Sequence, residues 1–449
     1  MKKKEKNMKK LISILLILVF VLSLTACGST PSGGGETPSG GGETPSGGSD
    51  KPAERVKITV WNYYSEHQLE YFQQVIKEFN ESQDKYEVVY EGQTKDYLDN
   101  VAQAEMAGAG PDFLIEYGDK AAMWHEDDLV VDLSKYLDAD TLNNLTDSAR
   151  TYATGFDDGG MYLYPIIGTG NICWYIREAL EAAEVEVPET WDELFAAAKQ
   201  IHDKVTVKTS DTGLEFVTDG SGVELFGWTS SMDETLLVVA NQCGGCYDPE
   251  TKTINLDNPK IIDWLEKFQK GCQEGYLSST FQNGYANTDQ EAGITAMGSS
   301  SVAGRPYYNI INPGSTHEMQ IDMADKANYA TIGRSRGIIV FNNGEDKIQG
   351  VCEFIKFFTQ PSYNAKFCEV MNYAAVLKGT LDDAGYKAYA GASEDLEKVW
   401  SEYGTNYPNS PESSYLKTAL KSIMGDVASG MDPKTAIENA ITTFNAQIG

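Results

Sequence analysis

Cys27 is the residue whose surroundings predict a covalent modification. It follows Leu24-Thr25-Ala26, and small or polar residues before a cysteine are typical of the site that a lipoprotein peptidase cleaves. Six lysines lie within the first ten residues, and an apolar stretch runs from Leu11 to Leu24. As a helix this stretch is roughly 21 Å long, too short for a bilayer core of about 30 Å but typical of a signal segment. We predict a lipoprotein signal peptide at residues 1–26 and a lipid on Cys27, which places the protein at the cell membrane on its extracytoplasmic face. An ordinary signal peptide with an incidental cysteine is the alternative.

The other six cysteines contain one close pair, Cys243-Gly244-Gly245-Cys246. Such spacing could serve redox chemistry or form half of a metal site. The sequence offers no second CxxC and no histidine beside the pair. We therefore expect a structural disulfide or two buried thiols in a glycine-rich turn.

The sequence contains none of the common catalytic motifs. There is no G-x-S-x-G, H-E-x-x-H or Walker A run. Asp138 and Asp140 lack the glycine and glutamate of a calcium loop. The histidines are scattered without metal-ligand spacing: His67, His125, His202 and His317. Carboxylate pairs carry no weight among 66 acidic residues. We predict that the protein is not an enzyme and uses no cofactor and no metal; a surface carbohydrate-active enzyme is the alternative.

A low-complexity segment follows Cys27 and extends to about residue 53. Thr-Pro-Ser-Gly-Gly-Gly-Glu occurs at 30–36 and again at 37–43, and a partial copy follows at 44–48. Gly, Ser, Thr and Pro bury too little apolar surface to offset the entropy of ordering, so residues 27–53 are predicted to be a disordered linker behind the lipidated cysteine. Its root-mean-square reach is roughly 25–30 Å, enough for a tethered domain to rotate toward a membrane partner.

Charge and length limit what the remaining chain can be. Residues 1–26 carry six lysines and one glutamate, so the chain without them has a formal charge of −35 rather than −30. This charge repels nucleic acids and anionic headgroups, which excludes a nucleic-acid partner. About 396 residues follow the linker, too many for one hydrophobic core, and two lobes are expected.

Strand and helix patterns alternate at the start of this globular part. We predict strands at 56–61, 86–90 and 113–115 and amphipathic helices at 66–79 and 96–106. This order is typical of a parallel sheet, in which ligands bind outside the carboxyl ends of the strands. Further along the chain we predict strands at 162–167, 172–176, 293–297 and 337–341 and helices at 234–240, 260–274 and 435–447, with another helix starting behind a Thr190 N-cap.

Several segments, in this order, resemble the bacterial extracellular solute-binding proteins of family 1, the sugar-binding subunits of ABC importers that include maltose-binding protein. The resemblance extends from about Val56 to the C-terminus, and Pro188-Glu189-Thr190-Trp191-Asp192-Glu193-Leu194 is its most specific motif. The other matching segments are Ile58-Thr59-Val60-Trp61, Phe79-Asn80, Gly108-Ala109-Gly110-Pro111-Asp112, Tyr164-Pro165 with Trp174-Tyr175, Ala296-Met297-Gly298, Ala428-Ser429-Gly430 and Ala436 to Ile441.

The resemblance implies an α/β fold of the two-lobed periplasmic-binding-protein-like kind (type II), with two parallel-sheet lobes joined by hinge segments. Lobe 1 would comprise residues 54–165 and 328–376, and lobe 2 residues 166–327 and 377–449. The implied function is that of a monomeric solute-binding lipoprotein. It would capture a carbohydrate, an oligosaccharide, in the cleft between the lobes and deliver it to the transmembrane subunits of an ABC permease. A receptor that reports a solute to a sensor kinase is a further alternative.

A sugar site needs an aromatic plane for the C–H face of the ring and planar polar groups for its hydroxyls. With 25 tyrosines and 7 tryptophans, the sequence is rich in aromatic planes. The expected ligand-binding residues are Tyr63, Tyr64, Glu66, Gln93, Tyr117 and Asp119 on lobe 1, and Thr169, Asn171, Trp228, Ser299, Ser300 and Arg305 on lobe 2. Tyr415 is added because the resemblance implies a pocket aromatic there. Trp228 and the pair Tyr63-Tyr64 are expected to contribute most.

Two departures from the family pattern argue against a maltodextrin-type pocket. Ile176 follows Tyr175 where the family often has Asn, and the loop after Met297 has no tryptophan. Arg305, Arg334 and Arg336 leave open an anionic ligand such as a uronic acid or a sugar phosphate, although three arginines in loops of an acidic protein are more often ion-paired at its surface.

Overall fold

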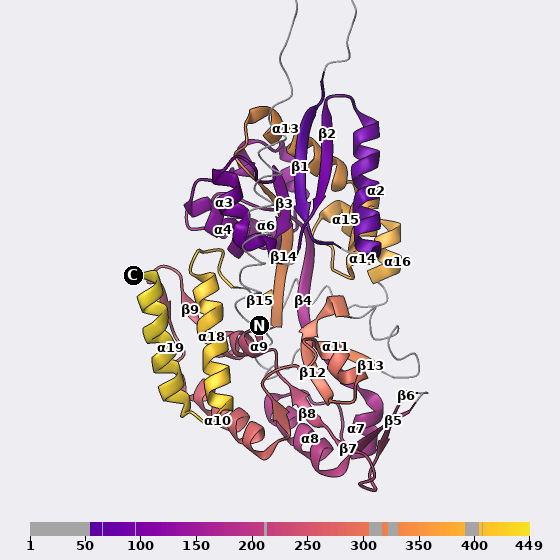
Figure 1. Cartoon of the computed structure of the whole chain (residues 1–449), viewed down its shortest axis with the longest axis vertical. Coiled ribbons are helices and arrows are strands. Elements are labelled where there is room, and N and C mark those ends of the chain that lie inside the picture. Colours follow the sequence, from indigo (N-terminus) through magenta and orange to yellow (C-terminus); the bar gives the residue numbers. More distant parts are fainter. Residues whose placement is uncertain are drawn as a thin grey trace, which may run out of the picture. The chain divides into compact units, whose positions relative to one another are not determined.

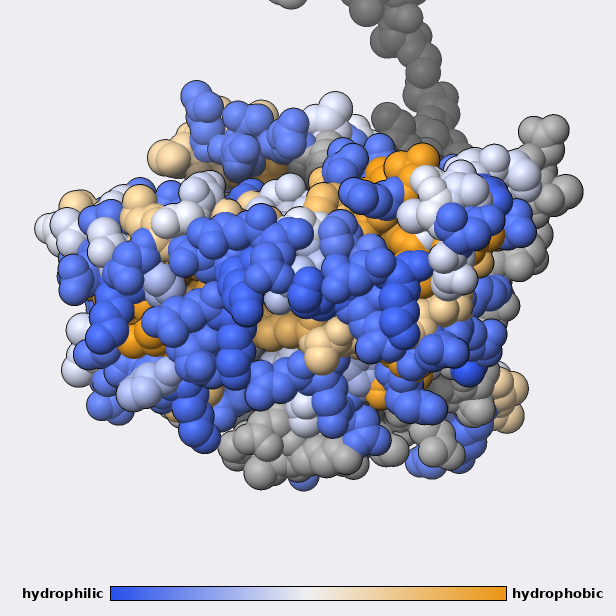
Figure 2. All heavy atoms as spheres, turned by 90° about the horizontal axis from the view of Figure 1, so that it is seen from below, coloured by the Kyte–Doolittle hydropathy of each residue, from blue (hydrophilic) through white to orange (hydrophobic). Residues whose placement is uncertain are grey.

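The computed structural model describes residues 54–64, 66–94, 96–210, 213–304, 317–321, 331–390, 404–405 and 407–449. The predicted signal peptide, Cys27 and the linker lie outside these residues. Within the described part of the chain, no helix is both long and apolar enough to cross a membrane. Hydrophilic residues cover most of the face seen in Figure 2, in keeping with the formal charge of −30.

The first described segments, from residue 56 to residue 126, form parallel strands with helices packed against them (Figure 1). Strand β1 (Val56–Asn62) lies between β2 (Tyr86–Gly92) and β3 (Phe113–Glu116), parallel to both. Helix α2 (Glu66–Ser82) connects β1 and β2 and buries Phe72, Val75, Ile76 and Phe79, as the periodicity predicts. The helix predicted at 96–106 is instead a 3-10 turn, η1 (Tyr97–Asn100), followed by the short α3 (Val101–Met106), and neither N-cap residue caps it with its side chain.

Two long strands, β4 (Tyr164–Ile176) and β14 (Thr331–Val340), form the middle of the sheet. In β4, residues Tyr164 to Gly170 pair with β14, and Asn171 to Tyr175 pair with β12 (Thr295–Ser301). The two strands predicted at 162–167 and 172–176 are therefore one strand. The glycines between them suggest an interruption in the sequence, but all 13 residues of β4 are buried between neighbouring strands.

At the other end of the sheet, the strands β8 (Phe226–Thr229), β11 (Leu277–Ser278) and β12 are also parallel to one another. Strand β8 lies between β11 and β12, and the order of the 10-stranded sheet is β11-β8-β12-β4-β14-β3-β1-β2, with β13 (His317–Ile321) paired to β4 and β15 (Gly404–Thr405) to β14. Helix α8 (Trp191–Lys204) packs closely on β8, since a side chain at Gly227 would overlap the backbone of Ala198. The predicted Thr190 cap is confirmed, because its hydroxyl oxygen accepts the Glu193 N–H at 3.2 Å.

The remaining elements complete the two ends of this sheet. The longer helices of the second half are α9 (Met232–Gln242), α10 (Pro259–Glu274), α18 (Ser413–Ala428) and α19 (Pro433–Ile448). Helices α13 (Glu345–Phe358), α14 (Pro361–Met371), α15 (Lys378–Asp382) and α16 (Ala384–Ala390) follow β14. Shorter elements are α4 (Gly118–Glu126), η2 (Leu133–Lys135), α5 (Ala139–Asn143), α6 (Asp147–Ala153), α7 (Arg177–Ala183), α11 (Ala286–Glu291), η3 (Val302–Gly304), the three-stranded sheet of β5 (Thr206–Ser210), β6 (Gly213–Val217) and β7 (Val223–Glu224), and the pair β9 (Tyr247–Asp248) and β10 (Thr253–Ile254).

Most of the buried side chains belong to two large cores. The first core contains Phe72, Phe354 and Phe358 among its members, and the second contains Trp228, Trp264 and Phe268. Strand β4 serves both, because Ile172 and Trp174 belong to the first core while Cys173, Tyr175 and Ile176 belong to the second. Leu377 and Tyr386 also pack into the first core, although the sequence interpretation assigns residues 377–449 to lobe 2. The lobe boundaries after residues 165, 327 and 376 stay a prediction.

Candidate functional site

The carboxyl end of β1 presents one of the two predicted tyrosines. Tyr63 is 39% exposed, and its ring centre lies 6.0 Å from that of Tyr97. Tyr64 is only 6% exposed and packs edge-on against Phe72 at 5.5 Å. The side chain of Asn62 fixes this turn by accepting the Tyr64 N–H at 3.0 Å. Tyr63 therefore offers an aromatic surface to solvent, whereas Tyr64 belongs mainly to the core.

A buried ion pair lies beneath these tyrosines at the end of β3. Arg336 on β14 donates to the Glu116 carboxylate at 2.9 Å and to the Ile115 carbonyl at 3.2 Å. Both charged side chains are almost fully buried. Burial raises the pKa of Glu116, and the guanidinium of Arg336 opposes that rise. The Tyr117 ring lies close to two guanidinium groups, 5.4 Å from that of Arg336 and 4.6 Å from that of Arg334.

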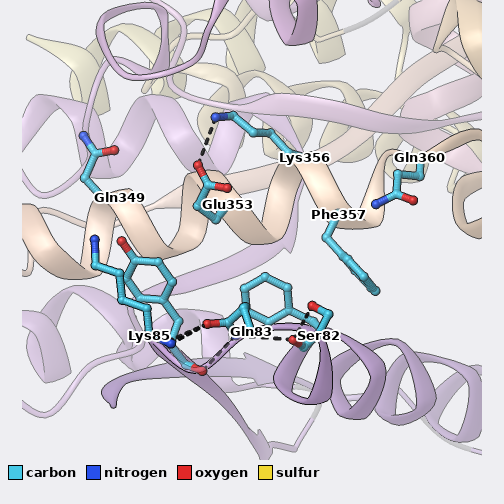
Figure 3. A pocket seen from close by; sticks show the side chains of 10 residues that line it. Ser82, Gln83, Lys85, Gln349, Glu353, Lys356, Phe357 and Gln360 are labelled. Carbon is cyan, nitrogen blue, oxygen red and sulfur yellow. Dashed lines mark hydrogen bonds and ion pairs between the residues drawn. The ribbon is translucent and has the colours of Figure 1, made fainter. Parts of the chain in front are cut away.

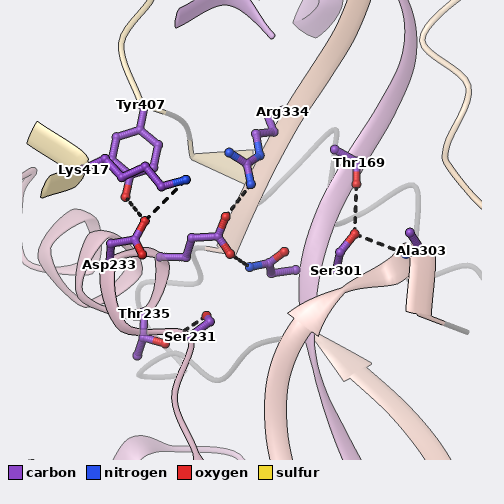
Figure 4. A network of polar contacts seen from close by, with 11 residues as sticks. Thr169, Ser231, Asp233, Thr235, Ser301, Ala303, Arg334, Tyr407 and Lys417 are labelled. Atoms are coloured by element: carbon purple, nitrogen blue, oxygen red, sulfur yellow. Dashed lines mark hydrogen bonds and ion pairs between the residues drawn. The ribbon is translucent and has the colours of Figure 1, made fainter. Parts of the chain in front are cut away.

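A second ion pair connects β14 to the first turn of α9 (Figure 4). Arg334 donates to one carboxylate oxygen of Glu234, and the Asn171 amide on β4 donates to the other. Burial alone would raise the pKa of Glu234, but the positive charges of Arg334 and Lys417, together with the hydrogen bonds from Asn171 and Arg334, hold the pKa below its usual value. The neighbouring Asp233 accepts a hydrogen bond from the Tyr407 hydroxyl at 3.0 Å, and its carboxylate lies 3.9 Å from the Lys417 ammonium.

Of the predicted ligand residues, several gather around these two ion pairs. Tyr63, Tyr64 and Tyr117 lie near Arg336, Asp119 acts electrostatically on Glu116 and Arg334, and Asn171 contacts Glu234. Thr169 lies on the same strand as Asn171, and its hydroxyl is 3.4 Å from that of Ser301. The cluster thus combines an exposed ring with amide, hydroxyl and charged groups, which is the chemistry that a polyhydroxylated solute requires.

Other predicted residues lie in different surroundings. Trp228 is fully buried in the second core, with its ring centre 5.9 Å from that of Trp191, and presents no surface to a ligand in this structure. Ser299 is buried and Ser300 half-buried on β12, and Glu66 is exposed at the start of α2. Gln93 follows β2, where its N–H donates to the Asn62 carbonyl at 2.8 Å. Tyr415 is 39% exposed on α18, and Arg305 lies outside the described residues.

The sequence does not indicate Glu116 or Glu234 as site residues, and it indicates Arg334 and Arg336 only through the alternative of an anionic ligand. The one available signal was the spacing of the two arginines, since residues two apart on a strand point to the same face. Nothing distinguishes the two glutamates among 66 acidic residues until the chain folds.

A surface cavity of about 710 Å³ lies elsewhere on the domain, between the end of α2, the start of β2 and helix α13 (Figure 3). Its polar groups include Glu353 and Lys356, whose charged atoms are 3.0 Å apart. None of the predicted ligand residues lines it. The residues that do are Phe79, Ser82, Gln83, Lys85, Tyr86, Gln349, Glu353, Lys356, Phe357 and Gln360.

Residues that could bind a metal ion or react as thiols have the following surroundings in the described part of the chain. Within it, no group of three or more His, Cys, Asp or Glu side chains is arranged to hold a metal ion. Asp138 caps α5 by accepting the Thr141 N–H at 2.8 Å, which lowers its pKa to about 2. Cys246 is a buried thiol after α9, and burial raises its pKa to about 12. A thiol with that pKa is not a ready nucleophile.

Two cores joined by shared strands, with a polar and aromatic cluster where β4 changes partners, define a two-lobed α/β binding protein. The chain belongs to the bacterial extracellular solute-binding protein family, whose model it matches over residues 74–394. It is 23% identical over 419 residues to the sn-glycerol-3-phosphate-binding periplasmic protein UgpB of Rhizobium meliloti (strain 1021), a match that covers 84% of this chain and 90% of the relative.

Solved structures share this fold at low sequence identity. The cyclic alpha-maltosyl-1,6-maltose binding protein of Arthrobacter globiformis superimposes with a TM-score of 0.72 at 17% identity, covering 88% of this chain and 99% of that one. The ABC substrate-binding protein Lmo0181 of Listeria monocytogenes, in complex with cycloalternan, gives 0.71 at 16% identity, covering 88% and 100%. The predicted fold class and family are confirmed, and members of this family bind solutes outside the cytoplasm.

Proposed function

We propose that this protein is the solute-binding lipoprotein of an ABC importer and that it captures a carbohydrate, an oligosaccharide, between its two lobes. The observation that carries the proposal is the cluster at the change of partners on β4. There, Tyr63 and Tyr117 supply aromatic surfaces, while Asn171 and Thr169 supply amide and hydroxyl groups. Aromatic planes beside planar hydrogen-bonding groups suit a sugar ring, which has an apolar face and a polar rim.

The names of the similar proteins support a polyol ligand of some kind. One structural neighbour is named for a cyclic maltose derivative, another was solved with cycloalternan, and the curated relative is named for sn-glycerol 3-phosphate. We extend to this chain the shared chemical feature of these ligands, a backbone rich in hydroxyl groups. Hydrolytic activity toward sugars would instead favour the alternative of a carbohydrate-active enzyme.

Delivery requires that the protein stay close to the membrane. We propose that Cys27 is lipidated after removal of residues 1–26, that residues 27–53 are a flexible tether, and that the monomeric protein presents its closed form to the permease. Ligand that contacts both lobes would favour closure, because it binds the closed arrangement more tightly than the open one. Lobe 1 would comprise residues 54–165 and 328–376, and lobe 2 residues 166–327 and 377–449. Permease genes beside the gene would favour import over the alternative of a receptor for a sensor kinase.

A thermal-shift screen of the mature protein over mono- and oligosaccharides tests the ligand class. A ligand at 100 times its dissociation constant adds about 2.7 kcal/mol to the stability of the folded state and should raise the melting temperature measurably. Scattering measurements with and without the best ligand should then show compaction. If no saccharide of any size raises the melting temperature while a peptide or an amino acid does, the carbohydrate proposal is wrong.

A further inference from the structure

The two arginines of the candidate site are already neutralised by acidic side chains of the protein. Arg334 and Arg336 lie two residues apart on β14 and pair with different elements, Arg334 with Glu234 on α9 and Arg336 with Glu116 on β3. Each ion pair is largely or wholly removed from solvent. Arginine is the residue best suited to hold a phosphate or carboxylate through two parallel hydrogen bonds. Here protein carboxylates occupy that role.

The wider surroundings of the two arginines are also balanced in charge. Lys120 and Lys417 add two positive charges near Glu116 and Glu234, and Asp119 and Asp233 add two negative ones. Together with the two arginines and their partners, these named groups comprise four cations and four carboxylates. An incoming anion would gain no net attraction from this set and would meet the oxygens of Glu116 and Glu234 at the guanidinium groups.

We propose that Glu116 and Glu234 are specificity-determining residues, which neutralise Arg336 and Arg334 so that the site accepts an uncharged polyol and rejects anionic ones. This inference rests on the proposed function and narrows its ligand class. It separates this chain from relatives that are named for sn-glycerol 3-phosphate, at 23% identity. The Nε–H of Arg336 is buried without a hydrogen-bond partner among the described residues, so it remains a donor that a neutral hydroxyl oxygen can accept from.

Substitution of one carboxylate by its amide tests the proposal. Glu234→Gln keeps the size of the side chain and its capacity to hydrogen bond, but leaves the Arg334 guanidinium unpaired in charge. Isothermal titration of the mature protein with sn-glycerol 3-phosphate and with glucuronate, against glycerol and glucose as uncharged partners, measures the consequence. The wild type is expected to show no binding of either anion at the highest concentration titrated, whereas E234Q should bind at least one of them with a dissociation constant on the order of 10- to 100-fold below that limit, most strongly at low salt.

Two further variants make the test specific. Glu353→Gln removes a carboxylate that pairs with Lys356 on α13, beside the separate surface cavity, and so produces the same change in net charge without touching the site. It should gain no anion affinity. In the double variant Glu234→Gln/Arg334→Gln the gain should disappear, because the guanidinium that receives the anion is gone. Circular dichroism establishes that each variant is folded, and Glu116→Gln provides a second, independent unmasking of an arginine.

The outcomes separate this inference from the proposed function. Binding of sn-glycerol 3-phosphate or glucuronate to the wild type would overturn the charge rule while leaving a polyol-binding protein. Folded E234Q and E116Q that both fail to gain anion affinity, or an equal gain in E353Q, would overturn it as well. The proposed function fails separately, when no saccharide stabilises the wild type, whatever the variants do.

Discussion

The guanidinium of Arg334 lies 4.6 Å from the centre of the Tyr117 ring, which brings β14 against the N-cap residue of α4. The same guanidinium donates to Glu234 at the first turn of α9. One arginine therefore contacts both the residue that precedes α4 and a residue in α9. Its position depends on a flat aromatic surface on one side and a carboxylate on the other.

Removal of that aromatic surface should loosen the arginine. Tyr117→Ala is expected to cost about 0.5–2 kcal/mol from the lost cation–π contact, in addition to the loss of packing. Tyr117→Phe keeps the ring and should cost far less. Urea unfolding of the two variants checks this, and equal losses in both would mean that the hydroxyl group matters more than the ring.

Glu234 predicts a particular dependence of stability on pH. Its pKa in the folded protein is below the ordinary value of 4.5 because the nearby positive charges and hydrogen bonds together outweigh burial. A carboxylate of this kind contributes stability that is present above pH 4.5 and is lost as the pH falls through its lowered pKa. The stability difference between the wild type and Glu234→Gln should thus be largest near neutral pH and shrink on acidification. Urea unfolding from pH 7 to pH 3 measures it, and a difference that grows in acid would contradict the assignment.

Glu105 predicts the opposite trend. Burial raises its pKa to about 7, and its Oε1 atom is buried without a hydrogen-bond partner among the described residues. Stability linked to the protonated form is complete below the ordinary value of 4.5 and is lost as the pH rises through about 7. Glu105→Gln should therefore be more stable than the wild type at pH 8, by about 1–3 kcal/mol, and nearly equal to it at pH 4. Thermal unfolding at the two pH values decides the matter; no gain at pH 8 would show that the ionised carboxylate is well solvated.

Trp228 offers a test of packing against binding. The indole is fully buried and its Nε1 has no hydrogen-bond partner among the described residues. Trp228→Ala should cost about 3–5 kcal/mol because it leaves a large cavity, whereas Trp228→Phe removes a buried polar atom and should cost much less. Ligand affinity in Trp228→Phe is expected to stay close to that of the wild type. A loss of affinity without a loss of stability would instead indicate that Trp228 contacts the ligand.

Local patterns in the sequence predict most helices and strands of the fold, but they do not predict which residues form the candidate site. Helix α2, the Thr190 cap and the parallel arrangement of β1, β2 and β3 follow from periodicity and capping, which are encoded within short stretches. The continuity of β4 was missed because its burial depends on β12 and β14, far away in the chain.

The site residues depend even more on distant contacts. The partners Arg334 and Glu234 are 100 residues apart, and Arg336 and Glu116 are 220 apart. Only the folded structure shows which of the many carboxylates pair with these two arginines. Trp228 is predicted as a ligand-binding residue, but its burial depends on a distant contact as well, because Gly227 allows α8 to pack closely against β8.

Strand β4 supplies Ile172 and Trp174 to one core and Cys173, Tyr175 and Ile176 to the other. Along residues 172–175, side chains of the first core alternate with side chains of the second. Unfolding of either core would therefore disrupt the strand that the other core needs. This arrangement couples the two cores in unfolding, so the domain should lose its structure in a single cooperative transition. The amide protons at the centre of β4 should then exchange with solvent only through that global event.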